Sequence, residues 1–193
     1  MTRRAAILVS GTGRHLEHIG RLCQAGELDL EVGLCLSNKP GVLALERAEA
    51  LGIPQLVLDP ERNLNDAGFS HAAFTAIQDA GCDLILLAGF LRMLVVPRAW
   101  NGRVLNIHPS LLPAFGGKGC WGHHVHQAVL DRGCQVTGCT VHVVDNEYDH
   151  GPIVLQRTCP VEPDDTVDSL AARVFEVERD AYPDAIRQYL ADA

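Results

Sequence analysis

The segment Asn-Ile-His-Pro-Ser-Leu-Leu-Pro, residues 106–113, holds the side chains best suited to chemistry. The amide of Asn106 can donate a hydrogen bond to a developing negative charge, and His108 can donate another and exchange a proton near neutral pH. Pro109 and Pro113 would restrict the backbone behind the two donors. A polar strand end that enters a turn has the same residue types, so this interpretation needs support from other segments.

A carboxylate beside His108 would favour the charged form of its imidazole. The polar turn expected near residue 145 offers three candidates: Asp145, Glu147 and Asp149. Asp149 is the most constrained, because the Gly-Pro pair at 151–152 follows it closely. The alternative is that these acids only solvate a turn. A covalent acyl intermediate has little support, because no Ser or Cys stands in a nucleophile-elbow context.

A second candidate site is the segment Ser-Gly-Thr-Gly at residues 10–13, between an apolar run and a helical pattern. Backbone amides at the start of a helix can bind a phosphate. Leu16 occupies the place of the third glycine in a dinucleotide fingerprint, so that motif is absent. Arg14 could add positive charge to a bound phosphate. Glycines that only form a tight turn are an equally good interpretation.

Apolar runs and helical patterns alternate along the first half of the chain. Strands are expected at 5–9, 31–35, 55–58, 84–87 and 104–107, and helices at 14–25, 41–51 and 66–80. A helix near 124–132, strands at 136–145 and 152–159, and a final helix after Thr166 follow. The pattern predicts an α/β fold, with an open, mostly parallel Rossmann-like sheet, helices on both faces and an antiparallel C-terminal hairpin extension.

Polar residues follow the carboxyl ends of four expected strands. They occupy positions 10–13, 37–39, 89–92 and 106–108. Ligands bind at the carboxyl ends of strands in such sheets, so these segments predict a site at one edge.

The bulk composition excludes some functions. We expect a single domain over 1–193, with a phosphate-binding half at about 1–100 and a catalytic half at about 101–193. A formal net charge of −8 argues against a nucleic-acid partner. The basic start has too short an apolar core for a signal peptide, and no run could span a membrane. We therefore expect a cytoplasmic protein whose seven cysteines are reduced thiols.

The segment around residues 120–126 contains four residues that could bind zinc: Cys120, His123, His124 and His126. Their spacing matches no recognised zinc frame, and no carboxylate stands nearby to complete a site. We expect no physiological metal.

The motifs NIHPSLLPAF (106–115) and VTGCTVHVVDNEYDHGPIVLQ (136–156) resemble those of the folate-dependent formyltransferases. Within that family, the similarity is greatest to the enzymes that formylate glycinamide ribonucleotide (GAR) in purine synthesis. It extends from the first strand to the last helix and includes the segments 37–54, 87–94 and 172–183.

The resemblance implies that a formyl group passes from 10-formyltetrahydrofolate, the co-substrate, to the amine of GAR. It implies that Asn106 and His108 stabilise the oxyanion and that Asp149 assists His108, with Thr140 and His142 supporting them. For GAR, the implied contacts are Gly11, Thr12, Gly13, Arg14, His15, Gly89, Pro109 and Glu178. For the folate, they are Leu91, Arg92, Leu94, Val144, Asp145, Tyr148 and Asp149.

Three features depart from the family pattern. Arg14-His15 replaces a usual Ser-Asn pair in the phosphate loop, and His150 replaces a small residue after the catalytic Asp. The loop at 116–126 is longer than in several relatives.

Three alternatives were weighed against the transferase. A formyltetrahydrofolate deformylase would use the same trio with water as acceptor, but its members carry an extra N-terminal domain, whereas the first strand here is expected near Ala5. A methionyl-tRNA formyltransferase would need a C-terminal RNA-binding domain beyond Ala193. A non-catalytic folate or nucleotide binder would need none of the three residues. We therefore expect the transferase.

Overall fold

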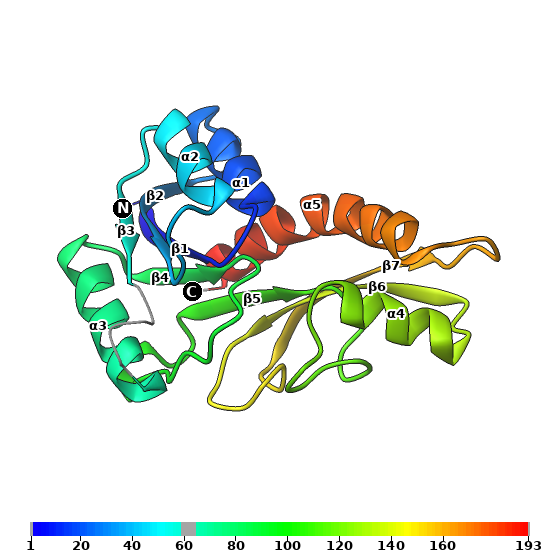
Figure 1. Ribbon diagram of the computed structural model, residues 1–193. Helices are drawn as coiled ribbons and strands as arrows, with labels where there is room; N and C mark the ends of the chain where they lie inside the picture. Colours follow the sequence, from blue (N-terminus) through cyan, green and yellow to red (C-terminus); the bar gives the residue numbers. More distant parts are fainter. Residues whose placement is uncertain (1, 59–64, 193) are drawn as a thin grey trace. The chain divides into compact units, whose positions relative to one another are not determined.

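The computed structural model describes residues 2–58 and 65–192 and contains two compact units, Met1–Leu105 and Asn106–Ala193 (Figure 1). Strand β5 (Val104–His108) contains the boundary between them. The expectation of a single domain with halves that meet near residue 100 stays a prediction.

The first unit is a parallel sheet with helices on both faces. Its strands are β1 (Arg3–Val9), β2 (Leu30–Ser37), β3 (Gln55–Val57) and β4 (Leu84–Leu87). Its helices are α1 (Arg14–Gln24), α2 (Leu43–Ala50) and α3 (Asp66–Asp79), and a short 3-10 helix covers Arg98–Trp100. The strands lie in the order β3-β2-β1-β4, and all three pairs are parallel.

The strand order explains where the helices lie. The chain moves from β1 to β2 to β3 in one direction and then returns past β1 to β4. Right-handed crossovers therefore place α1 and α2 on one face of these strands and α3 on the other, as Figure 1 shows. Both faces of β1 are covered, so Ala5–Val9 is fully buried and reads as one continuous apolar run.

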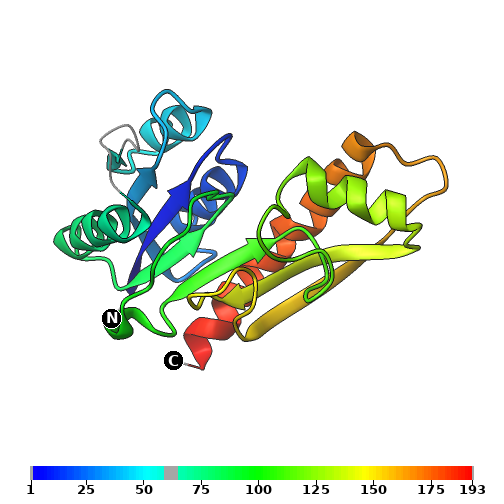
Figure 2. The same ribbon diagram turned by 60° about the horizontal axis from the view of Figure 1, so that its bottom comes forward.

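The second unit is an antiparallel hairpin covered by helices. It contains α4 (His123–Arg132), β6 (Val136–Val143), β7 (Ile153–Pro160) and α5 (Val167–Ala191). Helix α5 packs along both strands of the hairpin and also contacts α4 (Figure 2). Their shared core includes Val129 of α4, Cys159 of β7, and Leu170 and Val174 of α5.

The expected fold class is confirmed, with most elements within two residues of their predicted bounds. At the turn of the hairpin, β6 ends two residues earlier than predicted, at Val143, and β7 begins one residue later, at Ile153. The reason is local, because the β6–β7 register shifts between Val141 and His142 and the ladder ends there.

Two further findings concern the cysteines and membrane-spanning helices. All seven cysteines are free, and burial raises the pKa of Cys35 and of Cys139 to about 12, which keeps these thiols protonated. Within residues 2–58 and 65–192, no helix combines the length and apolar character required to cross a bilayer.

Asp165 fixes the start of α5. Its carboxylate accepts hydrogen bonds from Ser169 Oγ at 2.7 Å, from the Glu162 amide at 2.8 Å and from both terminal nitrogens of Arg173. Thr166, the helix N-cap, exchanges hydrogen bonds with Ser169 in a capping box. The bonds from Arg173, and then those from Ser169 and the amide, hold the pKa of Asp165 well below its usual value.

Replacing Asp165 by Asn should lower the melting temperature at pH 7 by roughly 3–6 °C. A lowered carboxylate pKa adds stability above the unfolded value of about 3.9, and this stability is lost as the pH falls through the folded pKa. The difference between variant and wild type should therefore shrink as the pH is lowered below about 4 in urea titrations. Asp164→Asn, at an exposed neighbour, is the matched control. Equal effects of both substitutions would contradict the anchoring role.

Candidate active site

Asn106, His108 and Asp149 come together in the second unit. Asn106 and His108 are two residues apart on β5, and alternation along a strand turns both side chains to one face. The Nδ1 atom of His108 lies 3.5 Å from Asp149 Oδ1, and the same oxygen lies 3.8 Å from His142 Nε2. His108 and His142 are both buried, and the Asp149 side chain is 13% exposed. One carboxylate therefore faces two imidazoles in a largely water-free setting.

His142 fixes the orientation of the Asn106 amide. The Nδ1 atom of His142 lies 3.1 Å from the Val143 carbonyl, which can only accept, so Nδ1 carries the proton. Its Nε2 then accepts from Asn106 Nδ2 at 3.0 Å. Burial lowers the pKa of His142 and keeps it neutral, which this tautomer requires. An amide nitrogen carries two hydrogens, so Asn106 retains a second N–H with which it can donate to a ligand oxygen.

His108 is held at both ring nitrogens. Its Nε2 lies 2.9 Å from the Phe115 carbonyl and donates to it, while Nδ1 faces Asp149. A doubly protonated imidazole satisfies both partners, since the carbonyl and the carboxylate both accept. No sequence pattern indicates the Phe115 contact, because any residue supplies a backbone carbonyl.

Asp149 is positioned by the loop that follows His108. Its Oδ2 accepts from the Gly117 amide at 3.0 Å. A Cβ at Gly116 would lie 2.5 Å from the Leu112 side chain and 3.2 Å from Asp149 Cβ. Only glycine at 116 therefore lets the loop approach closely enough for the Gly117 bond.

Thr140, on β6, fixes the backbone after His108. Its hydroxyl donates to the Ser110 carbonyl at 2.7 Å and accepts from the Leu112 amide at 3.0 Å. Gln156 Nε2, on β7, donates to the same hydroxyl and to the Leu112 carbonyl, each at 2.9 Å. The expected supporting role of Thr140 agrees with this geometry. Gln156 was missed, although an amide within the apolar run Ile-Val-Leu-Gln is a signal that could have found it.

Thr140→Val should reduce the free energy of unfolding by roughly 2–3 kcal/mol, because the Ser110 carbonyl and Leu112 amide lose a buried partner. Urea denaturation measures the loss. Thr140→Ser keeps the hydroxyl and is the matched control. A valine variant as stable as the serine variant would mean that these hydrogen bonds contribute little.

Residues 10–15, which are the expected phosphate loop, lie in the first unit. Ser10 Oγ donates to Asn38 Oδ1 at 2.7 Å and accepts from the Leu91 amide at 2.9 Å, which brings the ends of β1, β2 and β4 into contact. Gly13 caps α1 with φ 73°, and a Cβ there would lie 2.6 Å from Ala44 Cβ. Packing therefore explains the glycine at 13.

Gly11 is different, because a Cβ at this exposed residue would meet nothing within 4 Å. Neither packing nor a left-handed φ among the described residues requires glycine there. Close approach of a ligand to the backbone is a reason that remains, and the N-cap of α1 is Gly13, which has no side chain with which to cap the helix. Beside Gly11, Arg14 is exposed and His15 is buried.

Comparisons with known proteins show the family of this chain. Residues 3–186 match the model of the formyl transferase family. The chain belongs to that family. Phosphoribosylglycinamide formyltransferase from Bacillus subtilis is 34% identical over 97% of this chain and 95% of its own length. The trifunctional purine biosynthetic protein adenosine-3 from Gallus gallus is 41% identical over 95% of this chain, which spans only 18% of that relative.

Solved formyl transferases share the fold. Glycinamide ribonucleotide transformylase 1 from Symbiobacterium toebii superposes with a TM-score of 0.90 at 38% identity, covering 96% of this chain and 86% of its own. Phosphoribosylglycinamide formyltransferase from Bacillus halodurans gives a TM-score of 0.89 at 34% identity, over 97% of this chain and 95% of its own.

The other expected contacts of this formyl transferase differ in exposure. In the first unit, Leu91 is exposed and Leu94 is buried. Arg92 pairs with Asp66 at 3.1 Å and lies 4.4 Å from the centre of the Phe69 ring, so it also has a structural role.

In the second unit, Val144 and Pro109 are half-buried and Tyr148 is exposed. Glu178 is buried on α5. It follows Val174 by four residues, which places both side chains on one face of the helix. Burial lowers the pKa of His126, and the opposite influence of Glu178 only partly offsets it.

The Cys/His segment at 120–126 does not assemble a metal centre. Within the described residues, no group of three or more His, Cys, Asp or Glu side chains is placed to hold a metal ion. Trp121 instead contacts the His124 ring edge-on, with the ring centres 4.7 Å apart. The absence of a physiological metal stays a prediction.

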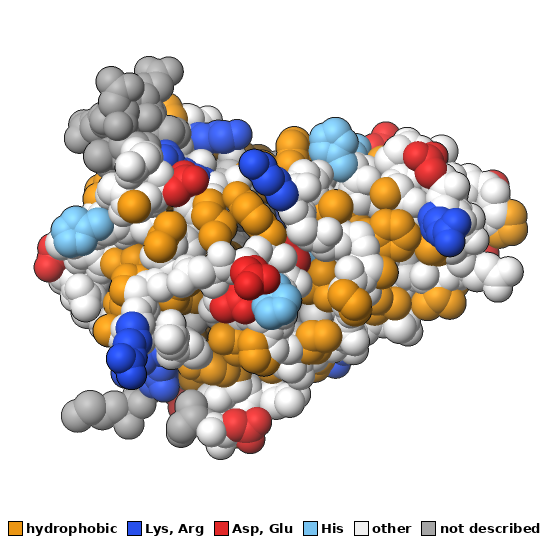
Figure 3. Space-filling model, turned by 90° about the horizontal axis from the view of Figure 1, so that it is seen from below, with side chains coloured by type: hydrophobic (Ala, Val, Ile, Leu, Met, Phe, Trp, Pro, Cys, Tyr) orange, Lys and Arg blue, Asp and Glu red, His pale blue; other side chains and the backbone are white. Residues whose placement is uncertain are grey.

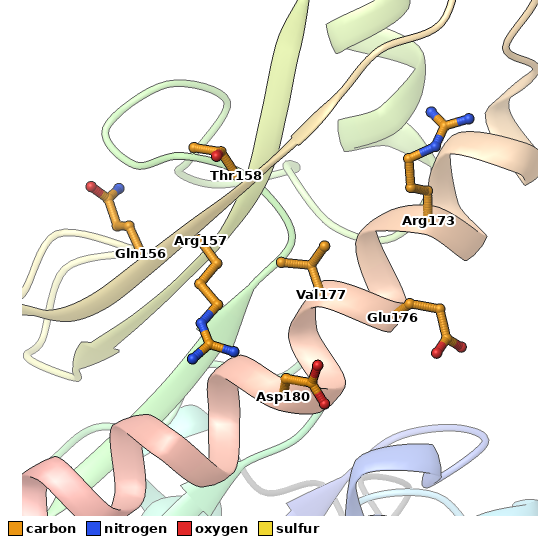
Figure 4. Close-up of a pocket in the computed structure, with 7 residues that line it drawn as sticks. All are labelled: Gln156, Arg157, Thr158, Arg173, Glu176, Val177 and Asp180. Carbon is orange, nitrogen blue, oxygen red and sulfur yellow. The ribbon is translucent and has the colours of Figure 1, made fainter.

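A separate hollow of about 650 Å³ lies between β7 and α5 (Figure 4). Its lining residues are Gln156, Arg157, Thr158, Arg173, Glu176, Val177 and Asp180. Arg157 is paired with Asp184 and Arg173 with Asp165. Both arginines of the lining therefore have carboxylate partners, and we assign the hollow no function.

Proposed function

We propose that this formyl transferase moves the formyl group of 10-formyltetrahydrofolate to the primary amine of GAR. The observation that carries the proposal is the arrangement in which Asp149 faces His108 while His142 aims the Asn106 amide. Relatives that share nearly their full length with this chain are named phosphoribosylglycinamide formyltransferases, which supports the same substrate.

The described residues fit both substrates. The exposed backbone at Gly11 and the N-terminus of α1 suit a phosphate group, and the buried carboxylate of Glu178 suits the amine end of glycinamide. We propose Thr12, Gly13, Arg14, His15, Gly89 and Pro109 as further contacts of GAR. For the folate, we propose Leu91, Arg92, Leu94, Val144, Asp145, Tyr148 and Asp149.

The folate supplies an activated formyl carbon, and the chain supplies electrostatics. As the amine of GAR attacks, negative charge develops on the formyl oxygen, and the second N–H of Asn106 donates to it. For His108 to donate as well, the formyl oxygen replaces the Phe115 carbonyl as the acceptor at Nε2. The Asp149 carboxylate stabilises the charged imidazole and is placed to receive, through water, the proton that the amine loses. The bond between the formyl carbon and N10 of the folate then breaks, and N10 takes up a proton as tetrahydrofolate leaves.

The alternatives have less support. A deformylase would use the same three residues, but its acceptor is water and it has no use for a phosphate-binding loop. A binder without activity would not need Asp149 held against His108. On the face seen in Figure 3, the Lys and Arg side chains lie at separate places rather than in one basic stripe. The absence of nucleic-acid and membrane partners and the cytoplasmic location stay predictions.

The test is a turnover assay with purified protein and 10-formyltetrahydrofolate, followed by the ultraviolet absorbance of the folate product. We expect product only when GAR is added. Equal turnover without GAR would indicate a deformylase, and no turnover under either condition would contradict the proposed reaction.

A further inference from the structure

The turn between β6 and β7 is closed at its base. A Cβ at Gly151 would lie 1.9 Å from the Val143 carbonyl, so the two backbones touch there. The Val143 amide also donates to the Pro152 carbonyl at 2.8 Å. Residues 144–150 therefore form a short loop whose two ends are held together, and this loop contains Asp149.

A contact between His150 and Asp145 joins the two ends of this loop, next to the close approach of Val143 and Gly151. The Nδ1 atom of His150 lies 2.9 Å from Asp145 Oδ2, and Glu147 Oε2 lies 3.9 Å from the same nitrogen. The other carboxylate oxygen of Asp145 accepts from the Glu147 amide at 2.8 Å. One oxygen of Asp145 therefore binds the Glu147 backbone amide, and the other binds the His150 side chain.

The charges favour this contact. The hydrogen bond with Asp145, and next the Glu147 carboxylate, raises the pKa of His150. Burial alone would raise the pKa of Asp145, but the hydrogen bonds from His150 and from the Glu147 amide lower it overall. Since the pair is exposed, its effect on global stability is small, and its consequence is local.

Asp149, directly before His150, needs such a local constraint. Its φ of 53° lies in the left-handed region, which residues other than glycine rarely adopt and which strains the backbone. Its side chain is tied to the Gly117 amide, but nothing in that bond fixes the peptide that follows it. The His150 contact holds the next residue and so restrains Asp149 from its other side.

We propose that His150 is a positioning residue. Its hydrogen bond with Asp145, called the clasp below, keeps the Asp149 carboxylate directed at His108. The role rests on the proposed function, since Asp149 acts in that reaction and the loop residues Val144, Asp145, Tyr148 and Asp149 are proposed folate contacts.

His150→Ala tests the clasp by kinetics. We expect kcat to fall about fivefold to tenfold and the KM for the folate to rise several-fold, while the KM for GAR stays unchanged. His150→Lys keeps a positive charge opposite Asp145 and should recover most of the loss. His71→Ala removes another exposed histidine, on α3, and should match wild type. Kinetic constants of His150→Ala equal to wild type would overturn the proposal.

A second readout does not depend on activity. The Gly117 amide donates to Asp149, so its cross-peak in a ¹H–¹⁵N spectrum reports how the carboxylate is held. The cross-peak should shift in His150→Ala and stay in place in His71→Ala. An unmoved cross-peak would overturn the clasp. A wild-type protein without GAR-dependent turnover would instead overturn the proposed function, and the spectrum would still decide the clasp.

Discussion

Asp149→Asn is expected to lower kcat by roughly 10²–10⁴-fold and to leave the protein folded. Asparagine has the same shape, tolerates the positive φ of this position, and can still accept from the Gly117 amide. What it lacks is the negative charge that faces His108 at 3.5 Å. The substitution therefore removes the support for a charged imidazole and the proton acceptor together. Steady-state kinetics and a melting curve measure the two effects separately.

The matched control is Asp131→Asn, which changes the same functional group at an exposed position of α4. It should leave kcat and both KM values near those of wild type. If Asp149→Asn also stayed within about twofold of wild type, Asp149 would have no part in the reaction.

Asn106→Ala is expected to lower kcat by roughly 10²–10³-fold, equivalent to about 3–4 kcal/mol of transition-state stabilisation. The donor acts on charge that develops only during the reaction, so both KM values should change little. The variant also leaves His142 Nε2 without the amide that donates to it at 3.0 Å. A modest loss of stability should accompany the loss of rate.

Asn101→Ala, at an exposed turn of the first unit, is the control for loss of an amide side chain. A large increase in KM with normal kcat in Asn106→Ala would show that Asn106 binds the substrate in its ground state. That result would contradict its role as an oxyanion donor.

The architecture could be predicted because buried strands and helices leave a characteristic order of apolar and polar residues in the sequence. Strands covered on both faces, such as β1, read as unbroken apolar runs, and the glycines at 13 and 151 mark places where another chain segment touches the backbone. The positions of Asn106 and His108 could be predicted for the same reason, since they occupy alternate positions at the end of a buried strand.

The details of the site could not be predicted. The acceptor at His108 Nε2 is a backbone carbonyl, which has no sequence signature. The neutral tautomer of His142 depends on the Val143 carbonyl and on burial, at a point where the register of the hairpin shifts. The Asp145–His150 contact depends on how tightly the turn closes, which residue types alone do not specify.

The central proposal, direct formyl transfer to GAR, is tested most directly by following the fate of a carbon-13 label. The purified protein would be mixed with 10-formyltetrahydrofolate labelled in the formyl group and with GAR, and the products would be separated and analysed by mass spectrometry. We expect the label in the new amide of GAR, with formate no higher than in a reaction without protein. Label that accumulates as formate while GAR stays unmodified would contradict the proposal.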